Sequence, residues 1–190
     1  MPRPLRDKTA GIFHVYTHGV WGYPALFRDE LDRLMFLRHL ARVSTRGGLT
    51  CMAFCLMNNH YHLIVEVDDG ILPAAMHDLN LPYALWFNSR ARLRGHVQYD
   101  HYNSRRILDE DDLLGCNAYV ANNPVRAELC RSADEWLWSS HAGTVGLREP
   151  HSFVDPSRLL APFRWTPDPR AALREFVDLR RESDGLVNRR

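Results

Sequence analysis

Two histidines, His60 and His62, lie in the segment Asn58-Asn59-His60-Tyr61-His62-Leu63-Ile64-Val65 at a spacing that suits a metal site. Alternate side chains of a strand point to the same face, so His60 and His62 share one face. Tyr61 takes the other face and is expected in the core. Neutral imidazoles commonly bind divalent metal ions, so the pair predicts half of a metal site. Ordinary packing of two strand histidines is an equally open interpretation.

Tyr119 and Asn123 could supply the other half. They are four residues apart in a segment of helical periodicity and therefore share a helix face. Alone, each has an ordinary explanation, since tyrosine rings usually pack in the core and Asn123 precedes a proline. Together, two imidazoles and an amide oxygen could hold a divalent cation that polarises a phosphate. The phenol could then attack the phosphorus and form a phosphotyrosine, which keeps the energy of the broken bond for rejoining.

The first half of the chain predicts the elements that carry the histidines. Gly11–Thr17 alternates as a strand, and Asp29 is suited to cap a helix that runs to about Arg46 and stops at Gly47-Gly48. Two apolar, β-prone runs on either side of Asn58-Asn59 then predict a hairpin.

The second half predicts three helices. One covers about Leu72 to Arg90 and is interrupted or restarted at Pro82; another begins in the acidic run 109–112 and ends before Pro124, with Asn123 leaving helical geometry. A last amphipathic helix spans about Ala171 to Arg181. Strands, helices and a hairpin predict a sheet with helices packed on it. We expect a main domain at 1–145 and a C-terminal helical extension at 146–190.

Composition excludes several classes of protein. The 190 residues are 45% hydrophobic and 25% charged with net charge +1, as in ordinary globular proteins. No apolar run is long enough to span a bilayer and no leader is evident, so a cytoplasmic protein without a membrane partner is expected. The four cysteines form no Cys-x-x-Cys pair, which argues against a disulfide framework or zinc ribbon.

The stretch from Arg90 to Arg106 is the part best suited to nucleic acid. It contains five arginines against one acidic residue, with histidines and tyrosines interleaved. Arginines contact phosphates, and aromatic rings stack on unpaired bases. A solvated helix face followed by an edge strand would give a similar pattern.

Several motifs follow one another in an order that is characteristic of a known family. They are His14-Val15-Tyr16-Thr17-His18-Gly19, Leu26-Phe27-Arg28-Asp29, Cys55-Leu56-Met57-Asn58-Asn59-His60-Tyr61-His62-Leu63, Phe87-Asn88-Ser89-Arg90, Tyr119-Val120-Ala121-Asn122-Asn123-Pro124-Val125-Arg126-Ala127 and Trp138-Ser139-Ser140. With them the chain resembles the single-tyrosine HUH transposases, and most closely the REP-associated tyrosine transposases of bacteria. One departure is Asn58, where the family usually has proline.

The resemblance implies an α+β fold with a central antiparallel sheet of ferredoxin-like or RRM-like type. It implies His60, His62 and Asn123 as ligands of Mg²⁺ or Mn²⁺, and Tyr119 as the nucleophile. The implied activity is nicking and rejoining of single-stranded DNA at hairpin-forming repeats through a 5′-phosphotyrosine, by a monomer or homodimer. By position and residue type, the expected DNA contacts are Arg90, Arg94, Arg105, Arg106 and Arg126.

Two other functions stay open. The chain could bind hairpin DNA or RNA without cutting, in the manner of a repressor. It could instead be a metal-dependent phosphoesterase that uses water, with Glu66 as a further ligand because alternation places it on the face of His60 and His62. If Tyr119 were not the nucleophile, Tyr61, Tyr99 and Tyr102 would be the next candidates.

Overall fold

A four-stranded antiparallel sheet forms the centre of the computed structural model, which describes residues 9–17, 25–91 and 102–187, with side chains up to residue 181. Its strands are β1 (Gly11–Thr17), β2 (Leu49–Leu56), β3 (Tyr61–Val67) and β4 (Asn103–Ile107), in the spatial order β2-β3-β1-β4. With helix α1 (Glu30–Ser44) after β1 and helix α2 (Ile71–Ala91) after β3, this is the ferredoxin-like order. The α+β prediction is confirmed.

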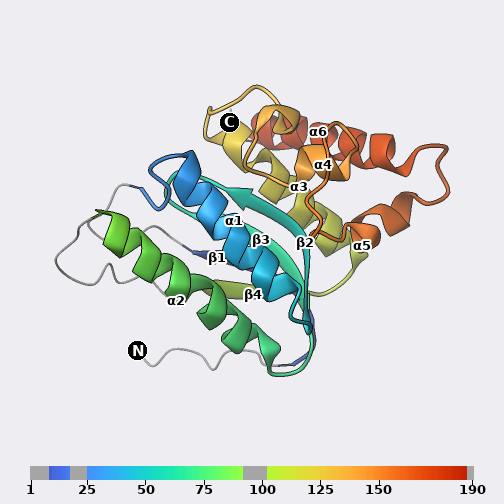
Figure 1. Cartoon of the computed structure of the whole chain (residues 1–190). Helices are drawn as coiled ribbons and strands as arrows, with labels where there is room; N and C mark the ends of the chain where they lie inside the picture. Colours follow the sequence, from blue (N-terminus) through green and yellow to red (C-terminus); the bar gives the residue numbers. More distant parts are fainter. Residues whose placement is uncertain (1–8, 18–24, 92–101, 188–190) are drawn as a thin grey trace.

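Helices α1 and α2 cover one face of the sheet (Figure 1). Asp29 caps α1 as expected, because its side chain accepts a hydrogen bond from the Asp32 N–H at 3.1 Å. The chain then turns through Gly47 and Gly48, whose φ angles of +92° and +75° favour glycine. Alternate residues of the central strands point into this layer and form its core with the two helices: Phe13, Val15, Tyr61, Leu63, Phe36 and Tyr83.

Two prolines lie inside continuous helices, against the predictions that one helix is interrupted or restarted at Pro82 and that another ends before Pro124. Pro82 is within α2, and Pro124 is within α3 (Glu110–Arg126). An interior proline costs about 3 kcal/mol, because it removes a backbone hydrogen bond and crowds the preceding turn. Buried residues on both sides of each proline offset this cost, including Leu79 and Tyr83 in α2. Asn123 therefore stays helical.

The opposite face of the sheet is covered by α3 and the C-terminal part of the chain (Figure 1). Leu159, Leu173 and Val177 are fully buried in the same core as Ile64 of β3. The expected C-terminal helix is present as α6 (Pro169–Val187). The other short elements are α4 (His141–Thr144), α5 (Ser157–Leu160) and the 3₁₀ turns Ala133–Glu135 and Ala161–Phe163. A domain boundary at residue 145 stays a prediction, although residues on both sides of it share this core.

The β2–β3 turn before His60 is held by hydrogen bonds to Asn58. Its carbonyl accepts from the N–H groups of Leu26 and Phe27, at 2.8 and 3.0 Å. Its side-chain oxygen accepts from the buried Arg33 guanidinium at 2.6 Å. These contacts restrain the turn at a position where the resemblance would have placed a proline.

Leu173→Ala tests whether α6 is part of the fold. Leu173 is fully buried between α6 and the second face of the sheet, so its truncation is expected to lower the free energy of unfolding by about 2–5 kcal/mol. Leu179 on the same helix is 56% exposed, so Leu179→Ala should change it by less than about 0.5 kcal/mol. Urea unfolding of both variants measures the difference. Equal, small effects would mean that α6 does not stabilise the domain.

Candidate active site

His62 lies on the face of the sheet that α3 covers. Tyr61 and Leu63 point to the opposite face and are buried in the α1/α2 core, as alternation predicted. The Tyr61 hydroxyl donates to Asn80 Oδ1 at 2.9 Å. His60 immediately precedes β3, and its ring centroid is 5.0 Å from that of His62. The two histidines are therefore neighbours at the start of a central strand.

Helix α3 brings Tyr119 and Asn123 to these histidines. Asn123 Oδ1 is 3.2 Å from His60 Nε2, and the Tyr119 ring meets the His62 ring edge-on with centroids 5.5 Å apart. Tyr119 keeps 39% of its side chain exposed, so a large substrate can reach it. His60 and His62 thus meet Tyr119 and Asn123 where α3 crosses β3, although the two pairs are far apart in the sequence.

The spacing of one pair of donor atoms, on His60 and Asn123, suits a divalent metal ion. When two ligand atoms bind an octahedral ion at right angles, each about 2.1 Å from it, they are about 3 Å from each other. The 3.2 Å between His60 Nε2 and Asn123 Oδ1 is close to this distance. Within the described residues, no cluster of three or more His, Cys, Asp or Glu side chains could hold a metal ion. A metal here would need the Asn123 amide as a ligand beside His60 and His62.

A cavity of about 650 Å³ opens beside these residues. Histidine, tyrosine, arginine and acidic side chains from β1, β3, β4, α3 and α6 line it, among them His14, Tyr16, His62, Arg105, Tyr119 and Arg180. Burial lowers the pKa of His14 to about 4, and the nearby positive charge of Arg105 adds to this shift. His14 is therefore neutral at pH 7.

Arg105 and Arg106 are neighbours in β4 but lie on opposite faces of the sheet. Arg105 is paired with His14 across the β1–β4 ladder and faces the cavity, where it donates to Asp112 at 2.8 Å. That hydrogen bond lowers the pKa of Asp112 and raises that of Arg105. Arg106 stacks over Phe13 and donates to the Ala10 carbonyl.

The other arginines expected at DNA also separate in space. The Arg126 guanidinium lies 5.2 Å from the centre of the Tyr119 ring, at the site. Arg90 lies at the end of α2 and forms ion pairs with Asp29 and Asp32, at 2.6 and 2.5 Å. Arg94 lies outside the described residues. Arg126 therefore lies beside Tyr119, and Arg105 lines the same cavity as Tyr119. Arg90 connects α2 to α1, and Arg106 lies over Phe13 on the other face of the sheet.

A solved structure shares this fold. It is a REP-associated tyrosine transposase bound to a REP hairpin. Its alignment covers 80% of this chain and 90% of that chain, with a TM-score of 0.63 and 14% sequence identity. No protein-family model matches the chain, and no curated protein matches it. At this identity the likeness establishes a common α+β fold.

Across residues 9–17, 25–91 and 102–187, every helix is too short or too polar to cross a bilayer.

The alternative nucleophiles and ligands lie elsewhere. Tyr61 and Tyr102 are buried, and Tyr99 lies outside the described residues. Glu66 is on the face of His62, as alternation predicted, but four residues further along β3, or about 13 Å. There it forms an ion pair with Arg158 of α5 at 2.5 Å. Glu66 is therefore poorly placed to share a metal ion with His62.

The cavity lining includes His14, Tyr16 and Arg180, for which the sequence predicted no functional role. His14 and Tyr16 alternate along β1 and thus share its cavity-facing side; their ring centroids are 5.1 Å apart. Arg180 is seven residues after Leu173 and three after Val177, so it extends the buried stripe of α6 into the cavity. The sequence signal for Arg180 was its position, because it is a charged residue at the helical spacing of the apolar stripe.

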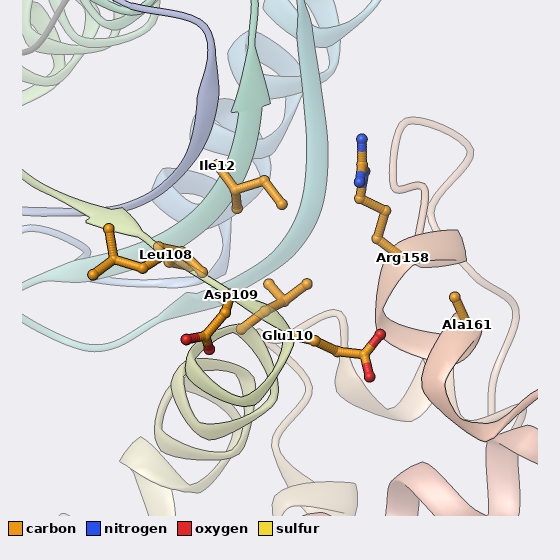
Figure 2. A pocket seen from close by; sticks show the side chains of 8 residues that line it. Ile12, Leu108, Asp109, Glu110, Arg158 and Ala161 are labelled. Atoms are coloured by element: carbon orange, nitrogen blue, oxygen red, sulfur yellow. The ribbon is translucent and has the colours of Figure 1, made fainter.

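A second, smaller cavity of about 280 Å³ lies between the start of α3 and the C-terminal segment (Figure 2). Ile12, Ile107, Leu108 and Leu113 contribute most of its apolar lining, and Arg158 of α5 lies across from Asp109 and Glu110 of the α3 start. His14, His62 and Tyr119 line the larger cavity instead. Residues suited to phosphoryl transfer are therefore concentrated at one place.

Proposed function

We propose that this chain is a metal-dependent single-stranded DNA transesterase, which nicks and rejoins DNA at hairpin-forming repeats through a 5′-phosphotyrosine. The observation that carries the proposal is the meeting of Tyr119 and Asn123 with His62 and His60 across the α3–β3 contact. A nucleophile beside a potential metal site is the arrangement that phosphoryl transfer requires. The fold shared with a hairpin-bound tyrosine transposase supports the proposal.

The chemistry assigns separate tasks to the residues of the site. His60, His62 and Asn123 would hold Mg²⁺ or Mn²⁺, which when bound withdraws charge from the phosphate oxygens. The Tyr119 oxygen attacks the phosphorus in line with the bond to the 3′ oxygen. As the Tyr119–phosphorus bond forms, the bond to the 3′ oxygen breaks; the phenol loses its proton and the departing oxygen gains one. Attack by a 3′-hydroxyl on the phosphotyrosine reverses the exchange and rejoins a strand.

Covalent capture tests the proposal directly. The protein is incubated with Mn²⁺ and a set of labelled single-stranded hairpins with 5′ and 3′ flanks, then run on a denaturing gel. A slower-migrating protein–DNA adduct is expected, which requires Mn²⁺ and disappears with EDTA. Binding that is insensitive to EDTA, without any adduct, would instead indicate a non-cleaving hairpin-binding protein. A released 5′-phosphate without an adduct would indicate a phosphoesterase that uses water.

Arg126→Gln tests the contact of DNA with the Tyr119 side of the site. Arg126 is exposed and lies over the Tyr119 ring, where its charge can pair with a phosphate next to the cleaved bond. Its loss is expected to weaken hairpin binding and to reduce the slope of log K against log salt by about 0.7 to 1. Fluorescence anisotropy at several salt concentrations measures both quantities.

Arg174→Gln is the matched control for Arg126→Gln. Arg174 is an exposed arginine of α6 that pairs with Asp134 at 2.6 Å, outside the residues that line the cavity. Its loss should leave the salt slope unchanged. If both variants lowered the slope equally, binding would depend on total charge and not on the Tyr119 site.

A further inference from the structure

His14 and His62 form a buried hydrogen-bonded pair behind the proposed metal site. His14 Nε2 lies 2.9 Å from His62 Nδ1, within hydrogen-bonding distance, and the two ring centroids are 5.1 Å apart. The two side chains are only 7% and 5% exposed. His14 is carried by β1 and His62 by β3, adjacent strands of the sheet, so rigid elements hold this contact in place.

The surroundings of His14 fix the orientation of its ring. Its centroid lies 5.1 Å from that of Tyr16 and 6.0 Å from that of Tyr119. His14 thus packs against two tyrosines while it contacts His62. A ring held in this way can hold the His62 ring in one orientation.

The contact also bears on which nitrogen of His62 can bind a metal. Since Nδ1 of His62 contacts His14, coordination by His62 would use Nε2. A hydrogen bond between two neutral imidazoles contains one proton. If His62 Nδ1–H donates to His14 Nε2, the Nε2 lone pair of His62 is available to a metal. If His14 donates instead, His62 Nε2 holds the proton and cannot coordinate.

We infer that His14 is a positioning residue, which accepts the Nδ1–H of His62 and so keeps His62 in the tautomer that can bind a metal ion. The inference rests on the proposed function above, because it assigns His62 to the metal. Metal-binding histidines usually donate their second ring N–H to an acceptor that fixes the tautomer, and loss of that acceptor typically weakens metal binding about 10- to 100-fold. Here the acceptor is an imidazole nitrogen.

The tautomer of His62 can be measured in the wild-type protein without metal or DNA. Long-range ¹H–¹⁵N spectra of ¹⁵N-histidine-labelled protein distinguish Nδ1–H from Nε2–H, and the His62 resonances are those absent from His62→Gln. A protonated Nδ1 is expected. A protonated Nε2 would overturn the inference and leave the proposal of a metal-dependent transesterase to its own test. Because this measurement needs no His14 variant, it is decisive even if such variants fold poorly.

Variants of His14 test the consequence for metal binding. Mn²⁺ titration followed by electron paramagnetic resonance is expected to show affinity about 10- to 100-fold weaker in His14→Phe, which keeps a flat ring and removes the acceptor. His14→Gln can place an amide oxygen near the former Nε2 position and should recover much of the affinity. His77→Phe alters an exposed α2 histidine and should leave it unchanged.

The outcomes separate the two proposals. Unchanged Mn²⁺ affinity in a folded His14→Phe would overturn the positioning role. Equal losses in His14→Phe and His14→Gln would also overturn it, because they would indicate a general packing effect. If wild-type protein bound no Mn²⁺, the proposed metal-dependent function would fail, and the tautomer of His62 would still decide the inference.

Discussion

Replacing Tyr119 by phenylalanine is expected to abolish the covalent protein–DNA adduct, with a loss of cleavage on the order of 10⁴-fold or more. The change removes one oxygen and keeps the ring, which packs edge-on to His62 and beneath Arg126. Folding and hairpin affinity should therefore remain close to those of the wild type. Adduct formation with a labelled hairpin and Mn²⁺, quantified over time, measures the loss.

Tyr16→Phe is the matched control for this experiment. Tyr16 is the second tyrosine among the residues that line the large cavity, and its ring centroid is 6.0 Å from that of His62. It lies on β1 and not on the α3 face with Asn123, so we expect its variant to form the adduct. An adduct that persisted in Tyr119→Phe and vanished in Tyr16→Phe would move the nucleophile to β1.

Asp32→Ala is expected to lower the free energy of unfolding by about 3 kcal/mol. The Asp32 carboxylate is fully buried and accepts hydrogen bonds from Arg28 at 2.8 Å and Arg90 at 2.5 Å. Removing one partner of a buried ion pair typically costs about 3–5 kcal/mol, because the remaining charge is left buried without its counterion. The side chains of Arg28 and Arg90 are about a third exposed to water, so we expect a cost at the low end of this range.

Asp78→Ala provides the comparison in urea unfolding. The Asp78–Arg46 pair links α2 to the turn that follows α1, but both side chains are about half exposed, so the loss should be below about 1 kcal/mol. If the two variants lost equal stability, burial of the Asp32 cluster would not be what stabilises the contact between the helices.

The same cluster predicts how stability depends on pH. The hydrogen bond from Arg90 lowers the pKa of Asp29 from 3.8 to about 2. Burial raises the pKa of Asp32, but hydrogen bonds from Arg28 and Arg90 outweigh it and leave the pKa below its usual value. Because both folded-state pKa values lie below the unfolded ones, this stabilisation is complete above about pH 4. It is lost as pH falls toward 2, and Asp32→Ala should show a smaller loss over that range.

The sequence was sufficient for much of the fold because its local patterns agreed with the final packing. Alternation in Gly11–Thr17, the cap at Asp29 and the apolar runs around Asn58-Asn59 each predicted the element that the structure contains. The two proline predictions were wrong, because local rules cannot weigh the burial on both sides of Pro82 and Pro124 against the lost hydrogen bond.

The arginines show a further limit of the sequence. Five were expected at DNA on residue type and position alone. Strand alternation sends Arg105 and Arg106 to opposite faces, and Arg90 is 2.5 Å from an aspartate that is 58 residues away in the chain. The partner of a long, charged side chain depends on which segments the fold brings together. The DNA contacts of the five arginines stay predictions, and Arg105 and Arg126 have the most suitable positions for such contacts.

By itself, the sequence determined which residues share a face: His60 with His62 through the period of a strand, and Tyr119 with Asn123 through the period of a helix. Only the tertiary structure decided that these two faces meet, since α3 crosses β3 through a core of residues distant in the chain. It also placed His14 against His62, and Arg180 in the cavity that Tyr119 lines. Local periodicity follows from backbone geometry, whereas contact between elements depends on how the whole chain buries its apolar surface.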